Sequence, residues 1–283
     1  MSLTTLVDTD TLARHLDDPS WVVFDCRHDL ARPDRGAAEY AKSHIPGARF
    51  LHLDRDLSAP MTGRNGRHPL PDPQALAAKL GAAGVGPATQ VVVYDAQGGA
   101  YAARAWWCLR WLGHDAVAVL DGGWGKWLKE DRPETAAVPA PTPAEFTARV
   151  RPLAVDAAFV LAHLRDPAVK VVDARANDRY RGENETLDPV AGHIPGSVNR
   201  VFKENLDASG RFKPAAQLRA EWETVLAGLA PEQVVHSCGS GVTAAHNLFA
   251  MELAGLAGSR LFGGSWSEWV ADPSRPVATG PTP

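Results

Sequence analysis

The stretch VVHSCGSGVTA at residues 234–244 decides the fold of this chain. Its apolar start reads as a strand that ends at Cys238, and Gly239 and Gly241 then form a tight loop before an apolar, helix-compatible segment that runs to Leu256. Such a loop can turn several backbone N–H groups inward, and the helix adds its positive end at the same place. Both features favour a thiolate over a thiol, so the stretch predicts a nucleophilic cysteine.

The chain carries the landmarks of this region twice. Four pairs of matching segments occur in the same order in both halves: VVFDCR at 22–27 and VVDAR at 171–175, HIPG at 44–47 and 193–196, VVVYD at 91–95 and VVHSC at 234–238, and LDGGW at 120–124 and LFGGSW at 261–266. Because the offset between the members of each pair is nearly constant, the sequence predicts a tandem of two similar domains.

The amino-acid composition marks the boundary between the two halves. The segment AAVPAPTP at 136–143 is rich in alanine and proline, which suits an extended linker. We therefore expect an N-terminal domain at 1–138, a linker at 139–150 and a C-terminal domain at 151–283. A glycine- and proline-rich segment at 58–73 reads as a long irregular loop within the first half.

Short β-branched runs alternate with helical patterns in each half. The expected strands are 22–25, 91–94 and 116–120, and the expected helices are 12–16, 74–80, 100–112, 156–164, 215–229 and 243–256. This alternation predicts an α/β fold in which each domain is a mostly parallel sheet with helices on both faces. Sites in such sheets form at the carboxyl ends of strands, and Cys238 lies at one of them.

The bulk properties exclude several classes of protein. A chain of 283 residues with 45% hydrophobic residues and a net charge of −4 has no basic tract for nucleic acid and no apolar run long enough to span a membrane. The N-terminus lacks the pattern of a secretory signal. The odd and small number of cysteines, three, argues against a disulfide framework and indicates a reducing, cytoplasmic compartment. These cysteines also lack the spacing of metal ligands, so a structural metal is not expected.

These landmarks resemble the rhodanese family of sulfurtransferases, in its two-domain form, over almost the whole chain. The residues that carry the resemblance are the Asp-x-Arg strand ends at 25–27 and 173–175, the paired HIPG motifs, the Cys238 loop and the closing Gly-Gly…Trp motifs. The loop CGSGVTA at 238–244 is similar to that of 3-mercaptopyruvate sulfurtransferases. Thiosulfate sulfurtransferases of the family carry basic residues where this chain has Gly239 and Ser240.

The resemblance implies a sulfurtransferase that moves a sulfane sulfur from 3-mercaptopyruvate, through a persulfide on Cys238, to a thiol or cyanide. A thioredoxin-like reductant is a further candidate partner, and no cofactor or metal is implied. Thiosulfate as the donor is the main alternative, and a non-catalytic sulfur carrier or regulatory module is a remote one. A cysteine phosphatase would need an arginine six residues after the cysteine, where this chain has Ala244.

The loop residues are the first candidates for substrate binding. Sulfur transfer needs a thiolate and a nest of N–H donors for the negative charge on the terminal sulfur. The candidates are Gly239, Ser240, Gly241, Val242 and Thr243. We expect Gly239 and Gly241 to permit positive φ angles. The hydroxyl groups of Ser240 and Thr243 are expected to add hydrogen-bond donors.

A guanidinium suits the anionic group of a sulfur donor. The resemblance assigns this role to Arg179, with Arg181 as an even choice between binding site and surface. The family's mercaptopyruvate enzymes show a second arginine before the second HIPG motif, but here the loop at 183–190 is acidic. Either Arg64, Arg67 or Arg181 supplies the second contact, or the carboxylate of the donor is recognised more weakly.

The first half is expected to be catalytically silent, because Asp95 occupies the position that corresponds to Cys238 and a carboxylate cannot perform this chemistry. Cys26 and Cys108 are expected to be structural. Two roles remain open for His44: a structural one before a tight turn, which its duplication as His193 favours, and an acid–base one.

Overall fold

The computed structural model describes residues 2–282, and these residues form two compact units. The first unit contains residues up to 59, residues 71–151 and the short segment 208–212. The second unit contains residues 152–207 and 213 onward, together with segment 60–70 from the first half of the sequence. None of the helices formed by residues 2–282 is both long and apolar enough to cross a membrane.

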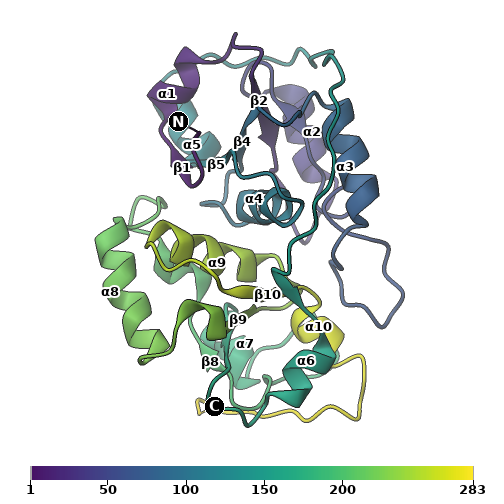
Figure 1. Ribbon diagram of the computed structural model, residues 1–283, viewed down its shortest axis with the longest axis vertical. Coiled ribbons are helices and arrows are strands. Elements are labelled where there is room, and N and C mark those ends of the chain that lie inside the picture. Colours follow the sequence, from purple (N-terminus) through teal and green to yellow (C-terminus); the bar gives the residue numbers. More distant parts are fainter. Residues whose placement is uncertain (1, 283) are drawn as a thin grey trace. The chain divides into compact units, whose positions relative to one another are not determined.

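The first unit is built on a sheet of five strands in the order β1-β5-β4-β2-β3, and every paired neighbour is parallel (Figure 1). The strands are β1 (Leu6–Val7), β2 (Trp21–Asp25), β3 (Arg49–Phe50), β4 (Gln90–Tyr94) and β5 (Val117–Leu120). The helices are α1 (Thr9–Arg14), α2 (Arg35–Lys42), α3 (Pro73–Ala82), α4 (Ala102–Trp111) and α5 (Gly123–Lys129).

The second unit repeats this plan with the order β6-β10-β9-β7-β8, again with parallel neighbours. Its strands are β6 (Ala154–Val155), β7 (Lys170–Asp173), β8 (Val198–Asn199), β9 (Val234–Ser237) and β10 (Arg260–Phe262). Its helices are α6 (Ala157–Ala162), α7 (Asn177–Arg181), α8 (Ala215–Leu226), α9 (Thr243–Leu253) and α10 (Ser265–Trp269), with 3₁₀ turns η1 (Phe202–Asn205) and η2 (Pro231–Gln233).

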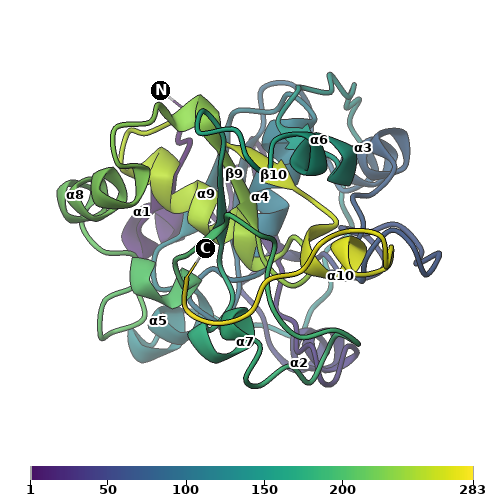
Figure 2. The same ribbon diagram turned by 90° about the horizontal axis from the view of Figure 1, so that it is seen from below.

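The central strands and their covering helices form the cores. All five residues of β4 and all four of β9 are buried, as expected for parallel strands covered on both faces. Helix α4 packs on β4 and β5, and α9 packs in the same way on β9 and β10 (Figure 2). These two helices are buried almost all round, and eight successive residues of α9, 244–251, are buried. The predicted α/β class and parallel sheets are confirmed.

The predicted duplication extends to individual contacts. The guanidinium of Arg27 lies 4.7 Å from the ring centre of Trp124, and its counterpart Arg175 lies 4.8 Å from that of Trp266. Each arginine forms a buried ion pair with the aspartate two residues before it. The backbone N–H of each arginine also donates to that aspartate at 2.9 Å, which fixes the strand-end loop.

Residues 139–150, the expected linker, form neither helix nor strand. They are nevertheless tied to the first unit, because the N–H of Ala144 bonds to the carbonyl of Gly81 and that of Arg149 to the carbonyl of Leu112. The expected helices have counterparts in α1, α3, α4, α6, α8 and α9, with ends displaced by a few residues. Helices α2, α5, α7 and α10 were not expected.

Candidate active site

Strand β9 positions Cys238. This strand lies between β10 and β7 in the sheet, ends at Ser237, and is followed by a short loop that leads into α9 at Thr243. Because the strands are parallel, Cys238 lies at the carboxyl edge of the second sheet and just before a helix N-terminus, as the sequence predicted.

The loop directs two backbone N–H groups at the sulfur. The N–H of Gly241 lies 3.1 Å from Sγ of Cys238, and that of Ser240 lies 3.4 Å from it. The cysteine is 2% exposed, and its own N–H donates to the Ser265 hydroxyl at 3.0 Å. Donors converging on a sulfur at a helix N-terminus favour negative charge there, so the geometry suits a thiolate.

The two loop glycines are required for different reasons. Gly241 has φ +76°, and a Cβ atom on it would lie 2.1 Å from the carbonyl oxygen of Gly263. Gly239, in contrast, is not among the residues with positive φ, so that expectation was wrong for it. Instead, a Cβ atom on Gly239 would lie 2.9 Å from Nη2 of Arg67, so Gly239 leaves room for a guanidinium.

Ser240 forms a contact that sequence reasoning missed. Its hydroxyl oxygen lies 2.7 Å from Nδ1 of His68, and both residues are buried. Segment 60–70, which carries His68, is anchored in the second unit: the N–H of Arg67 donates to the Ser267 hydroxyl at 3.0 Å. The glycine- and proline-rich composition of this segment marked it as an irregular loop, but no local pattern indicated what it contacts.

The acidic loop before the second HIPG motif binds Arg179. The Arg179 Nη2 atom lies 2.9 Å from Oε1 of Glu185 and 3.3 Å from Oδ2 of Asp188. Asp188 also pairs with Arg67, so one carboxylate joins two arginines. Burial alone would raise the pKa of Glu185, but the backbone N–H of Leu187 and the Arg179 guanidinium outweigh it and leave this pKa below its ordinary value.

The guanidinium of Arg179 lies beside the cysteine loop. A Cβ atom on Gly239 would be 3.5 Å from Nη1 and from Nη2 of Arg179. Arg181 is engaged elsewhere: it forms an ion pair with Glu183 and borders a cavity of about 370 Å³ that none of residues 238–243 lines. Of the two arginines proposed on α7, the structure therefore brings Arg179 to the loop.

His44 is buried within the first unit. Its Nδ1 atom lies 2.7 Å from the carbonyl oxygen of Tyr40, and Nε2 lies 3.2 Å from that of Ala137. The imidazole stacks on the Tyr40 ring, and the duplicate His193 stacks on Tyr180 in the same way. These contacts favour the structural role for His44.

Val242 and Thr243 connect the loop to α9. Val242 is 3% exposed and holds the N-cap position, where its carbonyl accepts the N–H of Ala245. Thr243 is the first helical residue and is partly exposed. Both residues fix the start of the helix next to the cysteine.

In the equivalent loop of the first unit, the side chain of Asp95 accepts the hydrogen bonds of the loop. The carboxylate of Asp95 accepts hydrogen bonds from four backbone N–H groups at 2.8–2.9 Å: those of Gln97, Gly99, Tyr101 and Ala102. The two loops are equivalent, because the N–H of Trp124 bonds to the carbonyl of Asp95 as that of Trp266 bonds to the carbonyl of Cys238. In both halves, the strand-to-helix turn thus directs backbone N–H groups at the side chain of the residue that ends the strand.

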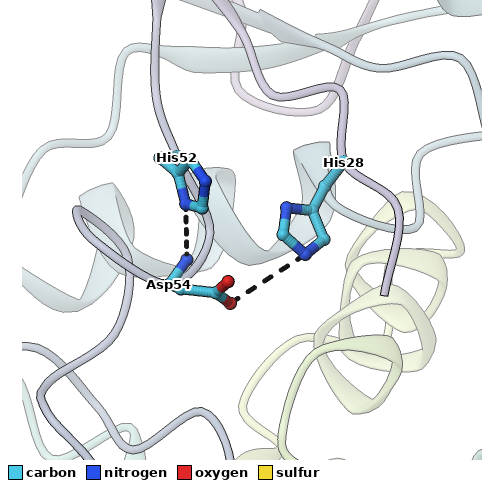
Figure 3. Close-up of side chains that lie close together, drawn as sticks. All are labelled: His28, His52 and Asp54. Carbon is cyan, nitrogen blue, oxygen red and sulfur yellow. Dashed lines mark hydrogen bonds and ion pairs between the residues drawn. The ribbon is translucent and has the colours of Figure 1, made fainter. Parts of the chain in front are cut away.

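The first unit also holds a group of side chains that could ligate a metal. One candidate ligand atom from each of His28, His52 and Asp54 lies within 4.8 Å of the others (Figure 3). However, Nδ1 of His52 accepts the N–H of Asp54 at 3.1 Å, so the proton of the neutral ring lies on Nε2. Coordination through Nε2 would require that proton to move. The chemistry proposed below uses no metal at this group.

Comparison with known proteins agrees with this architecture. The family model described as "Rhodanese-like domain" matches residues 8–130 and 156–272. The chain is 49% identical to a probable 3-mercaptopyruvate sulfurtransferase of Pseudomonas aeruginosa, over 99% of this chain and 100% of that protein. It is 37% identical to a thiosulfate sulfurtransferase of Bos taurus, over 86% of this chain and 83% of that protein.

A solved structure matches the whole fold. The 3-mercaptopyruvate sulfotransferase SseA of Escherichia coli superposes with a TM-score of 0.81 and 33% identity, over 93% of this chain and 99% of that one. The matched domain regions, the two equivalent sheets and the relatives lead to one conclusion. The chain belongs to the rhodanese family of sulfurtransferases and contains two rhodanese-like domains.

Proposed function

We propose that this protein transfers a sulfane sulfur from 3-mercaptopyruvate to a thiophilic acceptor through a persulfide on Cys238. The observation that carries the proposal is the pair of backbone N–H groups, from Ser240 and Gly241, aimed at the Cys238 sulfur. The 49% identity to a probable 3-mercaptopyruvate sulfurtransferase supports the choice of donor.

In the first half-reaction the Cys238 thiolate attacks the sulfur of the donor. The new bond joins Sγ to that sulfur, and the carbon–sulfur bond of the donor breaks with its electron pair left on carbon. The resulting enolate of pyruvate then takes up a proton. We assign delivery of this proton to the Ser240 hydroxyl, which the His68 imidazole contacts at 2.7 Å and can reprotonate.

In the second half-reaction the acceptor attacks the outer sulfur of the persulfide. Cyanide or a thiolate forms a bond to that sulfur, and the Cys238 thiolate leaves with the electron pair. The N–H groups of Ser240 and Gly241 stabilise the anion both before and after this step. Because pyruvate departs before the acceptor reacts, the kinetics should be ping-pong.

Thiosulfate is the second candidate donor. The same thiolate can attack its outer sulfur with sulfite as the leaving group, and the 37% identity to a thiosulfate sulfurtransferase supports this alternative. Comparing kcat/KM for the two donors separates the proposals. A higher value for 3-mercaptopyruvate supports our choice, and a large preference for thiosulfate would contradict it.

The first rhodanese-like domain is proposed to have no sulfur-transfer activity. Asp95 takes the position of Cys238, and its carboxylate already occupies the N–H groups of its loop. We also propose domain boundaries near 138 and 151, a cytoplasmic location, and a thioredoxin-like protein as one acceptor of the persulfide sulfur. The sparse cysteines and the thiol chemistry of Cys238 support the last two proposals.

The decisive variant for the proposed function is Cys238→Ser. This substitution keeps a hydroxyl in the loop but removes the sulfur nucleophile, so transfer from either donor should fall to background. The matched variants Cys26→Ser and Cys108→Ser change the two other buried cysteines and should retain transfer if they fold.

A further inference from the structure

A cavity in the first unit is lined by an arginine that has no acidic partner. The cavity has a volume of about 300 Å³, the size of a site for a small molecule. Residues 15–19 after α1, the start of β2, the turn at 46–47 and the linker residues 139–142 form most of its wall. Arg49, the first residue of β3, lines it as well.

The guanidinium of Arg49 has few partners within the protein. Its Nη1 atom donates to the carbonyl oxygen of Gly47 at 3.2 Å, whereas its Nε atom is buried and has no hydrogen-bond partner among residues 2–282. The guanidinium reaches the linker: Nη2 lies 3.8 Å from the Cβ position of Gly84, and the carbonyl oxygen of Thr142 lies 3.1 Å from that same point. A guanidinium has five N–H donors, so several can serve a bound acceptor.

The charge of Arg49 is also uncompensated. Burial lowers the pKa of Arg49 below its ordinary value, and the Tyr40 side chain opposes this shift only in part. Arg151 shows the contrast, because its hydrogen bonds to Asp115 raise its pKa. Removing a charge from water is costly unless an opposite charge or a hydrogen-bond acceptor meets it. An anion in the cavity would supply both.

The fold itself does not require an arginine at this position. Strand β3 pairs with β2 through Phe24 and Arg49, and in the second unit β8 pairs with β7 through Val172 and Val198 in the same way. A valine therefore holds the equivalent position of the second sheet. This comparison favours a ligand-binding role for Arg49 over a structural one.

The other walls suit an uncharged, apolar group. The indole of Trp21 lines the cavity and stacks on His15, with ring centres 4.1 Å apart. Asp17 and Asp18 line it too, and the Asp18 carboxylate accepts the N–H and the hydroxyl of Ser20. Four proline rings complete the apolar surface: Pro19, Pro46, Pro139 and Pro141. The cavity thus offers one cation beside apolar rings.

The cavity is separate from the strand-to-helix loop that corresponds to the catalytic loop. Most of its lining residues precede or begin β2 and β3, whereas the Asp95 loop follows β4. None of residues 95–101 lines the cavity. A ligand in this cavity would therefore bind away from the part of the rhodanese-like domain that carries the cysteine in the second unit.

We propose that this cavity binds a small organic carboxylate, with the carboxylate on the Arg49 guanidinium and an apolar or aromatic body against Trp21 and the prolines. The planar fork of a guanidinium matches a carboxylate. A monoanion suits the cavity better than a phosphate dianion, because Arg49 is the only lysine or arginine among the described lining residues and two aspartates lie in the same wall. This inference does not rest on the proposed function.

The test titrates the full-length protein with benzoate and follows the NMR signal of the Trp21 indole N–H, which Trp21→Phe identifies. We expect saturable shifts with a dissociation constant on the order of 1 mM. Benzyl alcohol, which keeps the ring and lacks the charge, should bind at least about tenfold more weakly. Inorganic phosphate, which lacks the apolar body, should also bind more weakly than benzoate.

Two variants remove the guanidinium. Arg49→Val installs the residue that the second unit uses at this position, and Arg49→Gln keeps a polar side chain if the valine variant does not fold. Either should weaken benzoate binding by about 10- to 100-fold. Arg14→Gln removes an exposed arginine at the end of α1 that does not line the cavity, and it should leave binding unchanged.

Three results would overturn the inference. The first is benzoate binding of equal strength in wild type and in a folded Arg49 variant. The second is binding that is lost in Arg179→Gln and kept in Arg49→Val, since benzoate would then occupy the site beside Cys238. The third is phosphate binding as tight as benzoate binding, which would show that the apolar wall recognises nothing.

Discussion

The backbone N–H of Cys238 donates a 3.0 Å hydrogen bond to the hydroxyl of Ser265, which in turn donates to the carbonyl of Phe262 at 2.9 Å. Ser265 has φ +53°, a left-handed conformation that its counterpart in the first half, Gly123, adopts with the same φ of +53°. The second domain thus keeps a serine where a glycine is less strained, and the serine hydroxyl holds the backbone of Cys238, the proposed nucleophile.

Replacing Ser265 tests whether this bond positions the cysteine. Ser265→Gly relieves the strain and removes the hydroxyl, so we expect kcat/KM to fall by about tenfold while the free energy of unfolding changes little. Ser265→Ala removes the hydroxyl and retains the strain, so it should lose both activity and stability. Equal activity in Ser265→Gly and wild type would show that the bond has no positioning role.

Replacing Asp95 tests the anion-binding nest of the first domain. Asp95→Asn keeps the shape of the side chain but removes the charge that four N–H groups face. We expect unfolding in urea to report a loss of about 2 kcal/mol, in the range of a hydrogen-bonded charge. Folded Asp95→Asn protein should transfer sulfur at the wild-type rate, and a large loss of kcat would contradict a silent first domain.

His236 should make stability depend on pH. It is fully buried in β9, and burial lowers its pKa to about 3 from an ordinary 6.5. Between these values the unfolded chain binds a proton that the folded protein does not, so the protein loses stability as the pH falls below 6.5. The limiting slope is about 1.4 kcal/mol per pH unit.

The repeat supplies the matched substitution for this prediction, because Val93 holds the equivalent position in β4. His236→Val should flatten the pH dependence of the free energy of unfolding between pH 6.5 and about 4.5. The measurement is urea unfolding at a series of pH values. Parallel curves for the variant and the wild type would show that His236 is protonated in the folded state.

The pairing of Ser240 with His68 predicts a loss in the chemical step. Ser240→Ala removes the hydroxyl that we assign to proton delivery, so kcat should fall by about 100-fold with KM for the donor less affected. His68→Gln should lower kcat similarly. A kcat unchanged in both variants would place proton delivery elsewhere.

Much of the fold could be predicted from the sequence because its signals are local or repeated. The buried strands β4 and β9 contain runs of three and two valines, and the duplicated landmarks mark the ends of these strands in both halves. Helices α7 and α10 were not predicted because each has only five residues, which are too few to show a clear hydrophobic periodicity.

The candidate site was predictable where its residues are consecutive and not where the chain folds back on itself. The Cys238 loop follows from its local pattern and Arg179 from the family resemblance, but His68 meets Ser240 across 172 residues of sequence. The acidic loop appeared to weaken anion binding, yet Glu185 and Asp188 are the partners that hold the arginines. A carboxylate near an arginine can compete with the substrate for that arginine, or it can orient the arginine. Only the three-dimensional contacts distinguish these two roles.

The most direct test of the account is the mass of the peptide that contains Cys238 after the protein meets 3-mercaptopyruvate without an acceptor. We predict the added mass of one sulfur atom on Cys238, its disappearance when cyanide is added, and no such addition on Cys26 or Cys108. Turnover of the donor with no sulfur ever bound to Cys238 would contradict the persulfide mechanism.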